Sequence, residues 1–158
     1  MARLGVVALF AGCGVPMLWG GQEFGDNSPR TIDFQPLQWW RMDSAAHRAH
    51  FDLVRRLIRA RRDHAALRSD NISFDWQDFA ASKLVQFWRR EDAAVGTNGD
   101  AAAVALNFAP VARRVAISLP FAGAWFDVFS NETWQVQNSP LSLTLPAYGA
   151  TLLLPAQA

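Results

Sequence analysis

The chain has 158 residues, of which 51% are apolar and 18% are charged, and its formal net charge is +1 at neutral pH. This length fits one ordinary domain or a small domain with an appendage, and so low a charge excludes global electrostatic attraction to nucleic acid or a membrane. A single cysteine, Cys13, excludes an internal disulfide and a cysteine-based metal site.

The first segment of the chain is apolar. Residues 2–11 are apolar on every face except at Arg3, which predicts the end of a helix buried in a larger body. A glycine turn follows, and then Val15–Trp19 has the continuous apolar pattern of a strand covered on both faces in a parallel sheet. The apolar run before Cys13 is short for a secretory signal, and Gly, Pro and Gln break it as a membrane span, so we expect a cytoplasmic protein.

A loop and a long helix come next. Residues 20–38 carry turn-forming residues, and Asp43 or Ser44 can cap a helix that runs to about Leu67. Phe51, Val54 and Ile58 recur at helical spacing, and Leu53 and Leu57 widen the apolar stripe. The opposite face is basic and is interpreted as solvated or salt-bridged; it consists of Arg48, Arg55, Arg56, Arg59, Arg61 and Arg62.

From Ile72 onward the apolar period changes to two, which predicts an antiparallel sandwich or barrel of short strands. The alternation is clear at Leu141, Leu143 and Leu145. The predicted strands are Ile72–Trp76, Leu84–Glu91, Ala102–Phe108, Arg113–Leu119, Ala124–Phe129, Thr133–Val136, Pro140–Leu145 and Thr151–Leu154.

This order of elements, with five short phrases, resembles the C-terminal part of the alpha-amylase family of glycoside hydrolases. The family's eighth barrel strand carries a G-x-P-(four residues)-G-x-E pattern, which Gly14, Pro16, Gly21 and Glu23 match at the right spacing. The other phrases are "PLQW", "LVRRLIRARRDHAALR", "AVALNFAP" and "LSLTLPAYGATLLLP". Ala65 departs from the family, which often has proline there.

The resemblance implies a mixed fold of two parts. Residues 1–70 are expected to be the tail end of a (β/α)8 TIM barrel, comprising the end of helix 7, strand 8 and helix 8. Residues 71–158 are expected to form an antiparallel all-β sandwich. A complete barrel takes about 200 residues or more, so its first seven strands have no counterpart here.

The resemblance also implies a retaining attack on alpha-glucosidic bonds by a carboxylate nucleophile and a carboxylic acid. The family's three catalytic acids follow strands four, five and seven, so no catalytic residue is assigned here and the isolated chain is expected to be inactive. Glu23, Trp19, Trp39 and Trp40 are the candidate substrate-binding residues, with Glu23 read as positioning a loop at the cleft floor. Asp26 and Asp33 are interpreted as turn residues, and His47 and His50 lack a third metal ligand.

We therefore expect an alpha-glucan or oligosaccharide substrate in the full-length enzyme, such as an amylase, branching enzyme or trehalohydrolase, with no cofactor and no metal. Residues 1–25 are expected to contact the missing barrel half or a second copy. One alternative is a non-catalytic carbohydrate-binding β-sandwich with an N-terminal anchor. Another is a split enzyme whose catalytic half is a separate polypeptide.

Overall fold

The structure is a computed structural model and describes residues 2–29, 32, 35–75, 79–91 and 99–156. The helical elements, with 3-10 turns labelled η, are α1 (Ala2–Ala11), η1 (Gln22–Phe24), η2 (Trp39–Asp43), α2 (Ala45–Asp63), η3 (Ala65–Leu67) and α3 (Phe79–Ser82). The strands are β1 (Ile72–Asp75), β2 (Leu84–Arg90), β3 (Ala101–Asn107), β4 (Arg113–Ile117), β5 (Gly123–Asp127), β6 (Glu132–Val136), β7 (Leu141–Leu145) and β8 (Ala150–Pro155). The eight strands predicted from Ile72 onward are all confirmed. Asp33 and Trp76, which the sequence analysis also names, lie outside the described residues.

The strands form two antiparallel sheets of unequal size. Six strands are arranged in the order β1-β2-β3-β8-β5-β6, and β4 pairs with β7 alone. The central strand β3 is buried along its whole length. Its alternate residues belong to two different hydrophobic clusters, because helices cover one face of the large sheet and the β4–β7 pair covers the other. A strand covered on both faces has no polar side, which explains the run of alanine, valine and leucine in β3.

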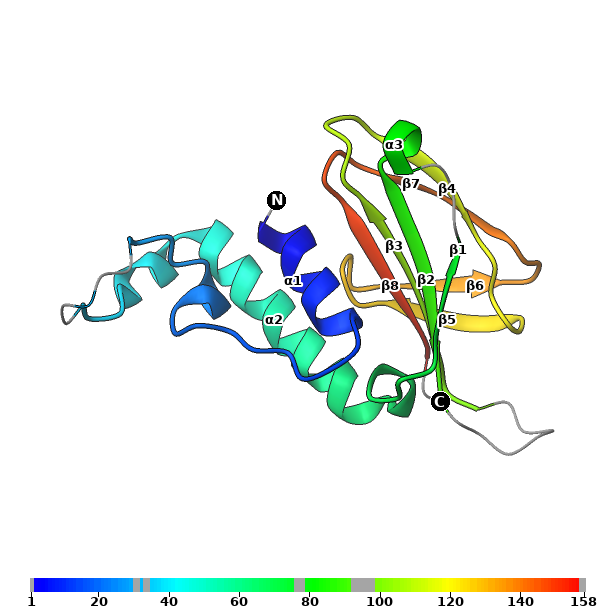
Figure 1. Cartoon of the computed structure of the whole chain (residues 1–158), viewed down its shortest axis with the longest axis horizontal. Coiled ribbons are helices and arrows are strands. Elements are labelled where there is room, and N and C mark those ends of the chain that lie inside the picture. The colour runs from blue at the N-terminus through cyan, green and yellow to red at the C-terminus, as the bar shows by residue number, and fades with distance from the viewer. Residues whose placement is uncertain (1, 30–31, 33–34, 76–78, 92–98, 157–158) are drawn as a thin grey trace.

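The helices and the large sheet share one core. Figure 1 shows α1 and α2 side by side, with α1 between α2 and the sheet. Val7 of α1, Leu57 of α2 and Leu152 of β8 are fully buried in this cluster. The second cluster, between the two sheets, contains the fully buried Trp125 and Ile117. The molecule therefore has three layers, with the helices outermost on one side.

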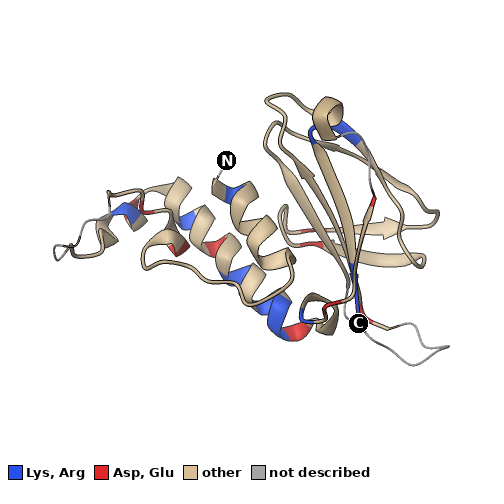
Figure 2. Cartoon of the chain, in the orientation of Figure 1, with Lys and Arg blue, Asp and Glu red and all other residues tan. Residues whose placement is uncertain are grey.

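The long helix α2 is amphipathic, as predicted, but Ile58 lies outside its buried apolar stripe. Leu53, Val54 and Leu57 are buried, whereas Ile58 is 51% exposed and faces away from the core. Figure 2 shows the arginines distributed along α2. Arg56 departs from the prediction of a solvated or salt-bridged basic face, because its Nε donates a 3.0 Å hydrogen bond to the carbonyl oxygen of Val128.

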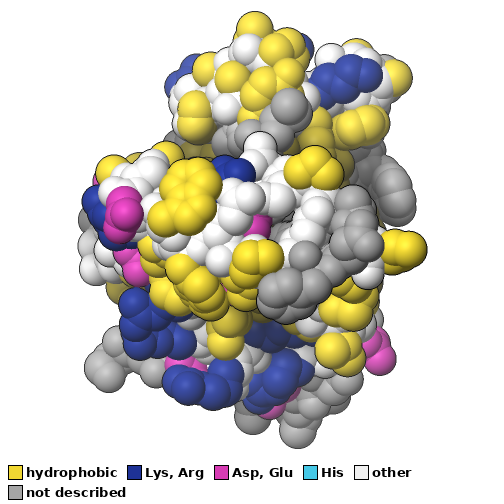
Figure 3. Space-filling model, turned by 90° about the vertical axis from the view of Figure 1, so that its left-hand side faces the viewer, with side chains coloured by type: hydrophobic (Ala, Val, Ile, Leu, Met, Phe, Trp, Pro, Cys, Tyr) yellow, Lys and Arg dark blue, Asp and Glu magenta, His cyan; other side chains and the backbone are white. Residues whose placement is uncertain are grey.

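The prediction of a buried strand at Val15–Trp19 is wrong for this structure. No strand forms there; Val15 is 95% exposed and Met17 is 80% exposed. A strand needs neighbours to pair its amides and cover its side chains, and the described part of the chain places none beside this segment. The exposed apolar side chains gather at the end of the molecule where the helical loops lie (Figure 3).

Cys13 is exposed. Within the described ranges, none of the helices is both long enough and apolar enough to cross a lipid bilayer.

Candidate functional site

The site is built around the tight turn that carries Glu23. Gly21 and Gly25, on either side of η1, have φ angles of 94° and 77°, which are left-handed values that glycine adopts without strain. The half-buried Glu23 carboxylate folds back on this turn, and its Oε2 accepts a 2.7 Å hydrogen bond from the backbone N–H of Gly21. The carboxylate is therefore held in one place by its own loop.

Two histidines of α2 contact the backbone of the same turn. His47 Nδ1 lies 2.7 Å from the carbonyl oxygen of Phe24, and His50 Nε2 lies 3.1 Å from the carbonyl oxygen of Gln22. These are the two residues that flank Glu23. Burial lowers the pKa of His50 from its ordinary value, the hydrogen bond to Gln22 opposes this effect, and the nearby Arg3 guanidinium adds to it. His50 is thus held in its neutral form.

Trp39 is tied to the turn through an aromatic contact. Its ring lies 5.0 Å from the ring of Phe24, centroid to centroid, and the Phe24 side chain is completely buried. Trp39 itself is 60% exposed, so one part of the indole is anchored while another part is free to meet a ligand. Aromatic rings presented in this way stack on flat ligands, including sugar rings.

The other two predicted tryptophans lie in the same region. Trp19 is 64% exposed, and its backbone N–H donates a 2.9 Å hydrogen bond to the side-chain oxygen of Gln22. Trp40 is 65% exposed, and the Arg41 guanidinium lies over its ring at 5.1 Å. The structure therefore brings Trp19 and Trp39 to the two neighbours of Glu23, whereas the described ring contact of Trp40 is with Arg41.

The acid Asp26 is a turn residue, as predicted, but its burial escaped sequence reasoning. Its Oδ1 accepts hydrogen bonds from the backbone N–H and the hydroxyl of Ser28, at 2.9 and 2.6 Å. Its side chain is fully buried and pairs with the Nε of Arg41 at 3.5 Å. The ion pair thus fastens the loop after Glu23 to η2, the element that carries Trp39 and Trp40.

A cavity of about 330 Å³ lies behind the loop, between it and α1. Its lining combines apolar residues such as Val6 and Leu18 with polar groups of Gln22, Asp26 and His50. Among the described residues, no three His, Cys, Asp or Glu side chains gather closely enough to hold a metal ion. The arrangement can orient and stack, and the groups described here point to binding rather than to proton transfer.

Comparisons with known proteins give a consistent result. No protein-family model matches the sequence. The 1,4-alpha-glucan branching enzyme of Leifsonia xyli subsp. xyli (strain CTCB07) is 32% identical over 171 residues, covering 92% of this chain and 22% of the enzyme. The isoamylase of a Flavobacterium species is 30% identical over 178 residues, with the same two shares. The chain thus spans about a fifth of the length of the curated relatives that it matches.

Solved structures agree with these relatives. The pullulanase of Paenibacillus barengoltzii is 25% identical, with a TM-score of 0.69 over 99% of this chain and 25% of the pullulanase. The similarity therefore covers the helical part as well as the sheets. The resemblance to the C-terminal part of alpha-amylase-family enzymes that was read from the sequence is confirmed.

Proposed function

We propose that this chain is the C-terminal part of an alpha-glucan-acting glycosidase or transglycosidase. Residues 1–70 are assigned to the tail of its (β/α)8 barrel and residues 71–158 to its β domain. Relatives that are named a branching enzyme, an isoamylase and a pullulanase support the substrate class. The cytoplasmic location expected from the sequence stays a prediction.

The observation that carries this proposal is the exposed segment Val15–Trp19. The side chains of Val15, Met17 and Trp19 lie largely in solvent, whereas Leu18 packs against the core. Exposed apolar surface of this kind marks a contact site. We assign residues 1–25 to contact with the rest of the barrel, with self-association as the outcome when that half is missing.

The chemistry proposed for the whole enzyme is a retaining displacement. One carboxylate attacks the anomeric carbon, and a carboxylic acid about 5 Å away protonates the leaving oxygen and later acts as a base. Neither role is assigned to a residue of this chain. Glu23, Trp19, Trp39 and Trp40 are proposed to border the substrate cleft, where Glu23 fixes the floor loop and the indoles stack on glucose rings.

Two assays of the purified chain test this function. We expect no release of reducing ends from soluble starch or amylose and no change in the branching of amylose. Turnover that is abolished by substituting any residue of this chain would refute the proposal, because it would place the catalytic machinery here.

The association assay addresses residues 1–25. We expect sedimentation velocity to show concentration-dependent association, and the Val15→Ser/Met17→Ser double variant to shift the chain toward the monomer. The matched control is Val111→Ser, which changes a 52% exposed valine on the β domain. A wild-type chain that stays monomeric at high concentration would contradict the assigned contact.

A further inference from the structure

We propose that His47 and His50 are positioning residues that clamp the Glu23 turn onto α2. Their spacing on one helix has the look of a metal site, yet the structure directs both rings at backbone carbonyls. The inference rests on the proposed function only where it concerns glucan. The clamp itself concerns only the conformation of the loop.

The two contacts fix opposite tautomers. A carbonyl oxygen only accepts hydrogen bonds, so the ring nitrogen that faces it has to carry the proton. His47 therefore carries a proton on Nδ1, toward Phe24, and His50 carries one on Nε2, toward Gln22. This pairing is specific, because a ring with the other tautomer presents a lone pair to the carbonyl lone pair.

The loop packs directly against both rings. A Cβ placed on Gly25 would lie 3.5 Å from His47 Nδ1 and 3.6 Å from His50 Cδ2. The clamp also reaches Trp39, since the carbonyl that His47 binds belongs to Phe24, on which the Trp39 ring rests. His47 and His50 thus fix the positions of both the Glu23 carboxylate and the exposed Trp39 ring.

The surroundings of His50 oppose its protonation. The side chain is 7% exposed, and its Nδ1 is buried with no hydrogen-bond partner in the described part of the chain. The charged and titratable groups around it are Arg3 on α1, His47 on α2, Asp26 on the loop and Tyr148 between β7 and β8. Burial is the largest influence and, together with Arg3, outweighs the hydrogen bond to Gln22, while the Asp26 carboxylate is already paired with Arg41.

The sign of the pH effect follows from this environment. The pKa of His50 is lowered in the folded loop, so an open loop binds the proton more readily than the clamped one. Clamping is complete above the ordinary histidine pKa of about 6.5 and weakens as the pH falls below it, until the folded-state pKa is passed. Mild acid should therefore loosen the loop.

Isosteric substitutions test the clamp. The asparagine amide nitrogen can take the place of Nδ1, and the glutamine amide nitrogen that of Nε2. His47→Asn and His50→Gln should therefore keep the contacts, and His47→Gln and His50→Asn should lose them. Protection factors are measured by amide exchange at Gly25 and Asp26, whose N–H groups donate within the turn at 3.1 and 2.8 Å. Loss of a contact should lower them about tenfold, with β3 amides unchanged as the internal control.

Two further readouts separate positioning from general stability. Long-range ¹H–¹⁵N spectra should show Nδ1–H for His47 and Nε2–H for His50 at neutral pH. Turn protection should fall in the wild type between pH 7 and 5, and this fall should be reduced in His50→Gln. Four variants that behave alike, or the opposite tautomers, would overturn the clamp.

Binding of maltoheptaose is measured in parallel. We expect His47→Gln and His50→Asn to weaken it, as Trp39→Ala does, whereas His47→Asn and His50→Gln retain it. Absence of maltoheptaose binding by the wild-type chain would count against glucan contact at Trp39 and thus against that part of the proposed function. The clamp would still be decided by its exchange and tautomer readouts.

Discussion

The buried Asn107 amide ties the end of β3 to the turn that follows β7. Its Nδ2 donates hydrogen bonds to the carbonyl oxygens of Pro146 at 2.8 Å and Val111 at 2.9 Å, and its Oδ1 accepts one from the backbone N–H of Ala109 at 2.9 Å. The side chain is fully buried. Two of the phrases that carry the family resemblance, "AVALNFAP" and "LSLTLPAYGATLLLP", meet at this one residue.

Replacing Asn107 should destabilise the β domain. In Asn107→Asp the carboxylate can no longer donate, so the buried carbonyls of Pro146 and Val111 lose their partner. We expect a loss of about 2–4 kcal/mol in the free energy of unfolding, measured by urea denaturation at pH 7. The control is Asn138→Asp at an exposed position, and equal stability of the two variants would show that the Asn107 bonds carry no weight.

Much of the fold could be predicted from the sequence because strand periodicity is a local signal. The alternation at Leu141, Leu143 and Leu145 and the breakers between strands placed all eight strands within a few residues. The segment Val15–Trp19 failed for a non-local reason. Its apolar pattern encodes burial between neighbours, and a strand forms only where such neighbours supply hydrogen bonds.

The site was harder to predict than the fold. The family resemblance made Glu23, Trp19, Trp39 and Trp40 the candidates, and these stay predictions. The sequence does not reveal which backbone groups a histidine or an arginine will meet. His47 and His50 read as a weak metal pattern and prove to contact carbonyls 23 and 28 residues away in the chain. The sequence predicts a solvated or salt-bridged Arg61. In the structure, Arg61 donates hydrogen bonds of 2.8 and 3.1 Å to the carbonyl oxygens of Phe10 and Gly12.

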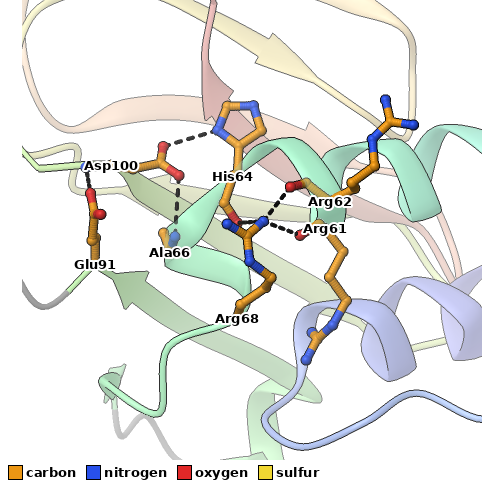
Figure 4. Close-up of polar contacts among 7 residues, drawn as sticks. All are labelled: Arg61, Arg62, His64, Ala66, Arg68, Glu91 and Asp100. Atoms are coloured by element: carbon orange, nitrogen blue, oxygen red, sulfur yellow. Dashed lines mark hydrogen bonds and ion pairs between the residues drawn. The ribbon is translucent and has the colours of Figure 1, made fainter.

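A second joint between helices and sheet lies at the end of α2 (Figure 4). His64 Nδ1 lies 2.9 Å from Asp100 Oδ1, and Asp100 Oδ2 accepts a 3.1 Å hydrogen bond from the backbone N–H of Ala66. Arg68 donates a 2.8 Å hydrogen bond to the carbonyl oxygen of Arg61, one of the groups left open at the helix end. The Asp100 carboxylate, directly before β3, thus connects the large sheet to η3 and to the end of α2.

Asp100 should make the chain sensitive to acid. Burial acts to raise its pKa, but the hydrogen bonds from His64 and from backbone amides outweigh burial, and the pKa lies below the ordinary value. A carboxyl with a lowered folded-state pKa stabilises the fold above its unfolded-state pKa of about 3.8, and this contribution is lost as the pH falls through the folded-state pKa.

The test compares urea denaturation of the wild type and Asp100→Asn at pH 7 and pH 3. At pH 7 the variant should be less stable by about 1 kcal/mol, and this difference should shrink at pH 3. Asp70→Asn, at an exposed position, controls for the loss of one negative charge. A constant difference between wild type and Asp100→Asn across this range would contradict the assignment.

The most deeply buried cation, Arg89 on β2, joins three segments of backbone. Its Nη1 donates a 2.7 Å hydrogen bond to the carbonyl oxygen of Ala11, the last residue of α1. Its Nη2 faces the carbonyl oxygens of Leu67 and Ser69, after α2. The side chain has no exposed surface, so it interacts with the electronegative end of α1 in a region shielded from water.

Removing this guanidinium should therefore detach α1 before it unfolds the β domain. Arg89→Met keeps most of the apolar bulk of the side chain. We expect it to lower the free energy of unfolding by about 3 kcal/mol, because the carbonyl groups of Ala11, Leu67 and Ser69 lose a charged partner. The same variant should be cut faster by chymotrypsin near Leu9 and Phe10, since α1 opens locally. Arg90→Met, at the exposed neighbouring position, should change neither quantity. If the two methionine variants unfold at the same urea concentration and are cut at the same rate, Arg89 does not fasten α1 to the sheet.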